Sequence, residues 1–213
     1  PLQRTAWAAN SNGLTRFGVY ALVTYLTSSL REVLLREYGM ARQDALTGLL
    51  NRRAFFDSGV IETGRAKRYG HPLGIVFLDL DDFNRLNDTR GHEVGDMAIK
   101  AVGSTLTRIL RDADIVGRLG GDEFAVVLPE TSFQSATEAG YKIENMINIA
   151  LRDFSPVSVS VGVAWFKDVS DHFQDMVNAA DGLMYEIKRA GKHGMRSEQF
   201  PAVVGNSASQ GEA

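Results

Sequence analysis

The feature that most constrains the fold is a pair of glycines followed directly by a pair of acids. Residues 120–123 read Gly-Gly-Asp-Glu, and they stand between two short apolar stretches, 115–119 and 125–129. Because glycine accepts the backbone of a tight turn, this pattern predicts a β-hairpin with the glycines at its bend. Ionised carboxylates in an apolar setting need a cation or hydrogen-bond donors. The hairpin therefore predicts two acids held at one turn, with a metal ion as one candidate partner.

A second acidic pair follows the most apolar run of the chain. Residues 74–78 form a continuous apolar run, typical of a strand covered on both faces, and Asp79 and Asp81 stand at its end. Strand residues two apart point to the same side of the sheet. If the hairpin pairs beside this strand, three or four carboxylates converge, as they do where proteins hold Mg²⁺ against substrate phosphates. An Asp-x-Asp pair alone is also common at a solvated strand end, so the prediction depends on the hairpin.

The remaining elements alternate along one domain, which we place at residues 44–196. Periodicity and capping signals predict helices over 51–67, 95–110, 135–151 and 173–188, and a further strand over 157–164. Asn51 is predicted to cap the first of these helices. Mixed helices and strands around one sheet indicate an α/β (α+β) fold. Residues 197–213 are small and polar, and we expect a disordered tail there.

Residues 1–43 predict a signalling helix ahead of that domain. Apolar residues alternate at spacings of three and four, as in a short coiled-coil seam that Glu37 interrupts, at Val23, Leu26, Leu30, Val33 and Met40. The apolar run 17–26 is too short to span a bilayer alone, but it also fits the last turns of a transmembrane helix. A dimerising helix and the end of a membrane segment are compatible readings. Since the sequence starts at Pro1 without a signal-peptide pattern, we expect a fragment of a longer protein.

Composition narrows the classes of function. With 44% hydrophobic residues among 213, the chain can bury a full globular core. A net charge of −3 provides no broad positive field, so we expect no nucleic-acid partner and favour small phosphorylated ligands. The chain has no cysteine, which removes disulfides, thiolate catalysis and cysteine metal sites. Any metal would therefore have oxygen ligands, and the composition is compatible with a reducing compartment.

In combination, the motifs resemble the GGDEF-domain family of diguanylate cyclases. The matching segments follow one another in the family's order and cover most of the main domain, at 44–53, 79–83, 87–96, 118–124, 159–163 and 180–192. The resemblance implies a central, mostly antiparallel sheet flanked by helices, akin to nucleotidyl cyclases and the palm of polymerases. It also implies a cytoplasmic catalytic domain, with an upstream sensor or an inner-membrane anchor in the full-length protein.

This family condenses two GTP molecules into cyclic di-GMP and two pyrophosphates, each 3′-hydroxyl attacking the α-phosphate of the other nucleotide. Each half-site holds one GTP, so the resemblance implies a homodimer, with Mg²⁺ or Mn²⁺ as cofactor. The implied metal ligands are Asp79, the Leu80 carbonyl, Asp122 and Glu123. The implied catalytic residues are Asp122 and Glu123, together with Gly120 and Gly121, which form the turn that carries them. Glu123 either ligates a second metal or helps deprotonate the 3′-hydroxyl.

The implied nucleotide contacts fall into two sets. Asn87 and Asp96 match the guanine contacts, because an amide both donates and accepts while a carboxylate accepts the two N–H bonds of the guanine edge. The triphosphate contacts match Phe83, Asn84, Lys188 and Lys192. The same residues also suit turns, helix starts and a helix C-terminus. Asn84 replaces a frequent lysine, Lys192 an arginine and His193 an asparagine, so we expect weaker GTP binding rather than inactivity.

A second ligand site is implied before the hairpin. Arg111 and Asp114 resemble the family's inhibitory RxxD site for the product, cyclic di-GMP, and Lys142 matches a further contributing position. R-x-x-D alone is a common surface pattern, so only its offset from Gly120 supports this reading. Besides an active, product-inhibited cyclase, two alternatives stay open: a weak or inactive domain that binds GTP or cyclic di-GMP, and a dimerisation scaffold. The intact acids favour the cyclase.

Overall fold

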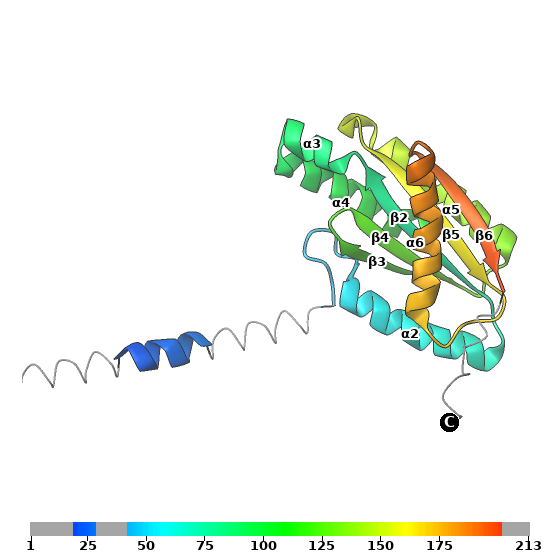
Figure 1. Cartoon of the computed structure of the whole chain (residues 1–213), viewed down its shortest axis with the longest axis horizontal. Helices are drawn as coiled ribbons and strands as arrows, with labels where there is room; N and C mark the ends of the chain where they lie inside the picture. Colours follow the sequence, from blue (N-terminus) through cyan, green and yellow to red (C-terminus); the bar gives the residue numbers. More distant parts are fainter. Residues whose placement is uncertain (1–18, 29–41, 202–213) are drawn as a thin grey trace, which may run out of the picture. The chain divides into compact units, whose positions relative to one another are not determined.

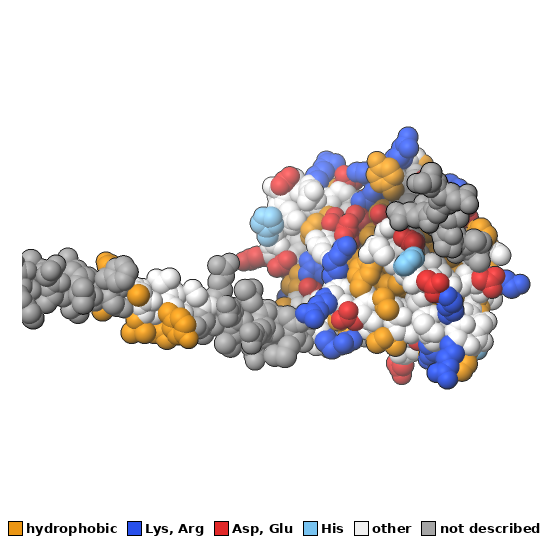
Figure 2. Space-filling model, turned by 60° about the horizontal axis from the view of Figure 1, so that its bottom comes forward, with side chains coloured by type: hydrophobic (Ala, Val, Ile, Leu, Met, Phe, Trp, Pro, Cys, Tyr) orange, Lys and Arg blue, Asp and Glu red, His pale blue; other side chains and the backbone are white. Residues whose placement is uncertain are grey.

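The computed structural model describes residues 19–28 and 42–201, which fall into two units, 1–42 and 43–213. In the first unit, residues 19–28 form a helix. Its exposed apolar side chains Val19, Leu22, Val23 and Leu26 recur at i, i+3, i+4 and i+7, which places them on one face. Figure 2 shows hydrophobic side chains gathered along one side of this helix. The other predicted seam residues, Leu30, Val33 and Met40, lie outside the described residues.

No helix within the described ranges combines the length and apolarity that crossing a membrane requires. On the face of the second unit drawn in Figure 2, acidic and basic side chains are interspersed.

The second unit is built on a six-stranded sheet in the order β1-β3-β4-β2-β5-β6 (Figure 1). The strands are β1 (Leu50–Asn51), β2 (Leu73–Asp81), β3 (Ile115–Gly120), β4 (Glu123–Pro129), β5 (Ser158–Phe166) and β6 (Gly194–Phe200). The β3–β4, β4–β2 and β2–β5 pairs are antiparallel, whereas the outer β1–β3 and β5–β6 pairs are parallel. The predicted mostly antiparallel sheet is confirmed.

Helices cover both faces of this sheet (Figure 1). They are α2 (Arg52–Tyr69), α3 (Phe83–Arg90), α4 (His92–Ile109), α5 (Phe133–Ala150) and α6 (Phe173–Ala190), with a 3-10 helix η1 (Arg152–Phe154). On β2, Val76 and Leu78 face the core under α4 and α5, while Ile75 and Phe77 face the core under α2 and α6. This alternation explains why the strand reads as a continuous apolar run. The Asn51 side chain accepts from the Ala54 N–H at 2.9 Å, so the predicted cap of α2 is confirmed.

A single residue, Asp82, separates β2 from α3. Asp82 alone takes the left-handed conformation, with φ 57°, and α3 begins at Phe83. This helix is eight residues long and mostly polar, with Leu86 as its one buried residue, so its periodicity is weak in the sequence.

The predicted disordered tail is wrong for residues 197–200. These residues belong to β6, which pairs in parallel with β5 from Ser160↔Gly194 to Phe166↔Phe200. The Phe200 ring stacks on Phe166 with centroids 5.4 Å apart. A polar edge strand has no local hydrophobic signal, and its partner lies about 34 residues earlier in the chain, so composition alone missed it. Residues 202–213 lie outside the described residues.

Candidate active site

The Gly-Gly-Asp-Glu turn joins β3 to β4, as predicted, with Gly121 and Asp122 as its two turn residues. Gly121 has φ 52°, a left-handed conformation that costs glycine little and other residues more. Arg118 on β3 stabilises the turn, because its Nε and Nη2 donate to the Gly121 carbonyl at 3.0 and 2.8 Å. Its Nη1 lies 3.2 Å from a carboxylate oxygen of Asp44. The turn is thus tied to the entry of the domain.

The Asp44 carboxylate that pairs with Arg118 is held in its ionised form. Burial of its carboxylate opposes ionisation, but hydrogen bonds from Thr47 and Arg118 prevail and lower the pKa of Asp44. The Thr47 N–H and hydroxyl donate to it at 2.9 and 2.7 Å. The Asp44–Arg118 pair therefore stays ionised at ordinary pH and holds the hairpin in place.

The hairpin pairs beside β2, which brings three acids together. Asp79 is the register partner of Glu123 across β2 and β4, and the Leu80 N–H donates to the Asp122 carbonyl at 3.3 Å. Burial, together with the charges of Asp122 and Glu123, raises the pKa of Asp79 to about 6 against the pull of Lys188. These three carboxylates therefore lie close enough for their charges to act on one another, and their convergence on one metal ion stays a prediction.

Lys188 on α6 supplies the counter-charge, because its ammonium donates to the Asp79 carboxylate. Asp181 lies seven residues earlier on the same helix, and therefore on the same face. Burial, then the charges of Asp181 and Asp122, raise the pKa of Glu123. Sequence reasoning assigned no role to Asp181, although its spacing from Lys188 was a usable signal.

Arg52 is a second residue that sequence reasoning missed. Its charge acts on Glu123 in the opposite direction to the neighbouring acids and lowers the pKa of that carboxyl. Its guanidinium lies 5.3 Å from the centroid of the Phe56 ring, one turn along α2. Only the fold places the start of α2 beside the hairpin, so the sequence carried no comparable signal.

Asp81, the possible fourth acid of the cluster, has another role. It is 1% exposed and accepts hydrogen bonds from the Ser160 hydroxyl at 2.9 Å, the Ser158 hydroxyl at 3.1 Å and the His193 N–H at 3.1 Å. These donors satisfy the buried charge within the protein. Asp81 therefore anchors the turn between α6 and β6 and does not join the three-acid cluster.

Among the described residues, no three acidic or histidine side chains are arranged to hold a metal ion. Lys188 compensates Asp79 instead. The chemistry of the site nevertheless fits Mg²⁺ or Mn²⁺, because the donors are carboxylate and carbonyl oxygens. Burial and the like charges of Asp122 and Glu123 raise the pKa of Asp79, and a bound cation would offset both effects.

The two residues predicted to contact guanine lie on neighbouring helices. Asn87 is on α3, and within the part of the chain that the structure describes its Oδ1 is a buried atom with no hydrogen-bond partner. Asp96 is exposed in the first turns of α4, directly after Gly95. A buried, unpaired acceptor is costly in a folded protein and is consistent with a ligand donor.

The residues predicted to contact the triphosphate divide between two places. Phe83 and Asn84 open α3, where the first backbone N–H groups have no intrahelical partner and favour an anion. Lys192 lies beside them, because its Nζ is 2.8 Å from the Asp82 carboxylate, a hydrogen bond that raises the pKa of Lys192. Lys188 lies at the carboxylate cluster instead.

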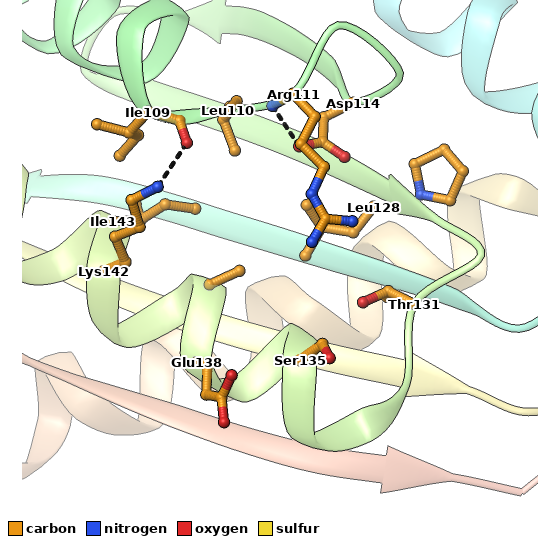
Figure 3. A pocket seen from close by; sticks show the side chains of 12 residues that line it. Ile109, Leu110, Arg111, Asp114, Leu128, Thr131, Ser135, Glu138, Lys142 and Ile143 are labelled. Atoms are coloured by element: carbon orange, nitrogen blue, oxygen red, sulfur yellow. Dashed lines mark hydrogen bonds between the residues drawn. The ribbon is translucent and has the colours of Figure 1, made fainter.

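The residues of the predicted product site line one pocket of about 230 Å³ (Figure 3). Arg111 and Asp114 approach it from the segment after α4, and the Arg111 N–H donates to the Asp114 carboxylate at 2.8 Å. Lys142 and Glu138 line it from α5. The Lys142 ammonium is engaged with the Ile109 carbonyl at 2.8 Å, and Figure 3 shows the Arg111 guanidinium extended over Leu128.

Comparison with known proteins agrees with this geometry. Residues 41–194 match the family described as "Diguanylate cyclase, GGDEF domain". The chain belongs to the GGDEF domain family. This GGDEF domain is 34% identical over 179 residues to the probable diguanylate cyclase DgcC of Escherichia coli (strain K12). The match covers 82% of the chain and 48% of DgcC, so the chain spans about half the length of that relative.

A second curated protein and a solved structure are also similar to this domain. The cyclic di-GMP phosphodiesterase NbdA of Pseudomonas aeruginosa is 34% identical over 157 residues, which are 72% of this chain and 20% of NbdA. The crystal structure of the GGDEF domain of DgcB from Caulobacter crescentus, in complex with c-di-GMP, matches with a TM-score of 0.66 and 28% identity. That match covers 74% of this chain and 95% of the DgcB domain. The predicted family and its fold are therefore confirmed.

Proposed function

We propose that this chain is the catalytic part of a diguanylate cyclase, which condenses two GTP molecules into cyclic di-GMP and releases two pyrophosphates. The observation that carries the proposal is that β2 pairs with β4 so that Asp79 is the register partner of Glu123, with Asp122 near enough for its charge to act on both. A domain that has lost turnover would be expected to lack at least one of these acids. The name of DgcC supports the same reaction.

In this proposal, Asp79, the Leu80 carbonyl, Asp122 and Glu123 hold Mg²⁺ or Mn²⁺. When bound, the metal would lower the pKa of the 3′-hydroxyl and neutralise charge on the phosphate oxygens. The 3′-oxygen forms a bond to the α-phosphorus of the facing nucleotide as the bond to pyrophosphate breaks. The raised pKa of Glu123 suits it to receive the hydroxyl proton.

The chain's cations and amides would hold the triphosphate during this step. The first N–H groups of α3 and the ammonium of Lys192 already lie together, as an anion site requires. Lys188 would leave Asp79 for a phosphate oxygen once the metal takes over that carboxylate. Asn87 and Asp96 would select guanine.

The reaction needs a second copy of the chain, because each half-site holds one GTP. The apolar stripe Val19, Leu22, Val23 and Leu26 provides a surface for parallel helix pairing. In the full-length protein, a sensor before this helix would change the pairing and bring the two half-sites together or apart.

The deciding experiment is incubation of the chain with GTP and Mg²⁺, followed by chromatographic separation of the nucleotides. We expect cyclic di-GMP and pyrophosphate from the unmodified chain, no product with ATP alone, and no detectable product from Asp122→Asn. Circular dichroism of Asp122→Asn should match the unmodified chain, since Asp122 is a half-buried turn residue outside both hydrophobic cores.

Failure of a demonstrated dimer to form cyclic di-GMP would refute the cyclase. The alternative is a weak or inactive GGDEF domain that binds GTP or cyclic di-GMP. It has some support from NbdA, in which a similar segment occurs in a protein named for the opposite reaction. Binding of GTP without turnover would then identify the domain as a sensor.

Product inhibition is a second proposal, supported by the pocket that gathers Arg111, Asp114 and Lys142. Guanidinium binds both phosphate and the Hoogsteen edge of guanine, so Arg111 would contact cyclic di-GMP. We expect Arg111→Ala to raise the inhibitory concentration of added cyclic di-GMP by about tenfold, the effect of roughly 1.4 kcal/mol of lost binding. Its initial rate should stay within about twofold of the unmodified chain. Arg108→Ala, one turn earlier on α4, is the control, and equal inhibition of both variants would contradict the assignment.

A further inference from the structure

Gly95 lies where a side chain would collide with the amide that we assign to guanine. It is buried in the first turn of α4, and a Cβ built on it would lie 1.9 Å from Asn87 Oδ1, 3.0 Å from Asn87 Cγ and 3.2 Å from Phe83 Cζ. Real Cβ atoms essentially never come closer than 3.0 Å to such an atom. The need for glycine here is therefore steric, and Asn87 is the group that would have to give way.

The backbone prevents Asn87 from giving way as a whole. Its carbonyl accepts from the Gly91 N–H at 2.9 Å, and the Gly91 carbonyl accepts from the Gly95 N–H at 3.3 Å. Gly91 is the single residue between α3 and α4, so these two bonds hold Asn87 and Gly95 in neighbouring turns. The remaining response to a side chain at position 95 is rotation of the Asn87 amide.

The Asn87 amide also has no partner that would hold it elsewhere. In the described part of the chain, its Oδ1 is buried and accepts no hydrogen bond. A buried acceptor without a donor is costly, and a ligand N–H group that reached it would remove that cost, so the direction of Oδ1 decides which donors it can meet.

We propose that Gly95 is a positioning residue for base selection: its bare α-carbon leaves the space in which the Asn87 amide is directed at guanine. This inference rests on the proposed use of GTP. A methyl group at position 95 turns the amide, so guanine loses an acceptor for its N–H groups, while the triphosphate contacts at α3, Lys188 and Lys192 remain. Gly95→Ala should therefore weaken guanine nucleotides selectively.

The test is calorimetric binding of the α,β-methylene analogues of GTP and ATP, which cannot release pyrophosphate, to the full chain in Mg²⁺. We expect Gly95→Ala to reduce the preference for the guanine analogue by about tenfold, equivalent to the loss of one good hydrogen bond. The affinity of Gly95→Ala for the adenine analogue should change by less than about twofold, because the substitution leaves the triphosphate contacts in place. Gly140→Ala is the matched control, because this buried helical glycine would meet Val163 Cγ2 at 2.6 Å, at the contact of α5 with β5 and not at α3 or α4.

A double-variant cycle identifies Asn87 as the group through which Gly95 acts. In an Asn87→Ala background, Gly95→Ala should have no further effect on base preference. The double variant should also unfold at a higher temperature than Gly95→Ala alone, because Asn87→Ala removes the side chain that collides with the new methyl group. This stability comparison remains decisive if Gly95→Ala alone folds poorly.

The outcomes separate the two proposals. If the unmodified chain prefers neither analogue, the proposed use of GTP fails. If it prefers guanine, but Gly95→Ala keeps that preference or the effects of the two substitutions simply add, the inference about Gly95 is overturned. Loss of preference in Gly140→Ala as well would reduce the effect to general packing and would also overturn it.

Discussion

Ionisation of Asp79 destabilises the fold, although the proposed metal site needs the ionised carboxylate. Burial and the charges of Asp122 and Glu123 raise its pKa to about 6, from an ordinary value of 3.8. The folded state therefore binds the proton more tightly than the unfolded chain does. The cost of ionising Asp79 is absent below about pH 4 and complete above about pH 6, so this group makes the free energy of unfolding fall as pH rises through that window.

Asp79→Asn should accordingly stabilise the metal-free protein at pH 8 and leave it nearly unchanged at about pH 3.5, below the window. We expect a gain of roughly 1–2 kcal/mol at pH 8, or a few degrees in melting temperature. The measurement is thermal unfolding by circular dichroism in a chelator at both pH values. Asp112→Asn, in the exposed segment before β3, is the control. An equal shift at both pH values would show that the destabilisation does not arise from ionisation.

At the residue scale, motifs and spacing predicted most of the candidate site. Asp79 and Glu123 do face each other, and Asn51 does cap α2. The sequence could not separate Asp79 from Asp81, because both occupy the same side of β2. Only the neighbouring strand decides: Asp81 meets two β5 hydroxyl groups, whereas Asp79 meets Lys188.

At the element scale, β6 converts an apparent tail into part of the domain. It pairs along the whole of β5 from residue 160 to 166, and its Met195 and Phe200 side chains pack against the two cores. Without β6, the apolar strand β5 would become an exposed edge, which is a site for aggregation. Periodicity in α4, α5 and α6, and the Asn51 cap of α2, made those helices predictable, whereas β6 depends on a partner distant in sequence.

Truncation tests the role of β6. Removal of residues 194–213 should lower the melting temperature by several degrees, at roughly 2–4 °C for each kcal/mol lost, and should increase aggregation. Removal of residues 202–213 alone is the control, and we expect its melting temperature to match that of the full chain. Equal stability of the two truncated proteins would mean that β6 contributes nothing to the domain.

At the scale of the whole molecule, the proposed activity depends on a unit that is separate from the catalytic fold. Contacts divide the chain at residue 42, and the exposed apolar stripe lies entirely in the first unit. A fragment of residues 43–213 should therefore keep its melting temperature but lose the means of pairing. We expect its cyclic di-GMP formation per molecule to be low in dilute solution and to rise with protein concentration.

Substitutions within the full chain test the same dependence. Leu22→Glu with Leu26→Glu places two charges on the stripe and should reproduce the concentration dependence of the fragment, measured by rate assays alongside sedimentation. Ala21→Glu, on another side of the helix, should behave as the unmodified chain does. Concentration-independent rates in the doubly charged variant would exclude this helix as the dimer contact.

The sequence by itself determined the hairpin with its glycines, the strand that ends in Asp79, the main helices and the family. Each of these is encoded within a few neighbouring residues, by turn chemistry or by the period of apolar side chains. Tertiary structure alone decided that Lys188 neutralises Asp79, that Asp81 is satisfied by β5, that β6 completes the sheet, and that Gly95 borders Asn87. These contacts depend on strand register and helix packing, which bring together residues up to 109 positions apart, and no local pattern specifies them.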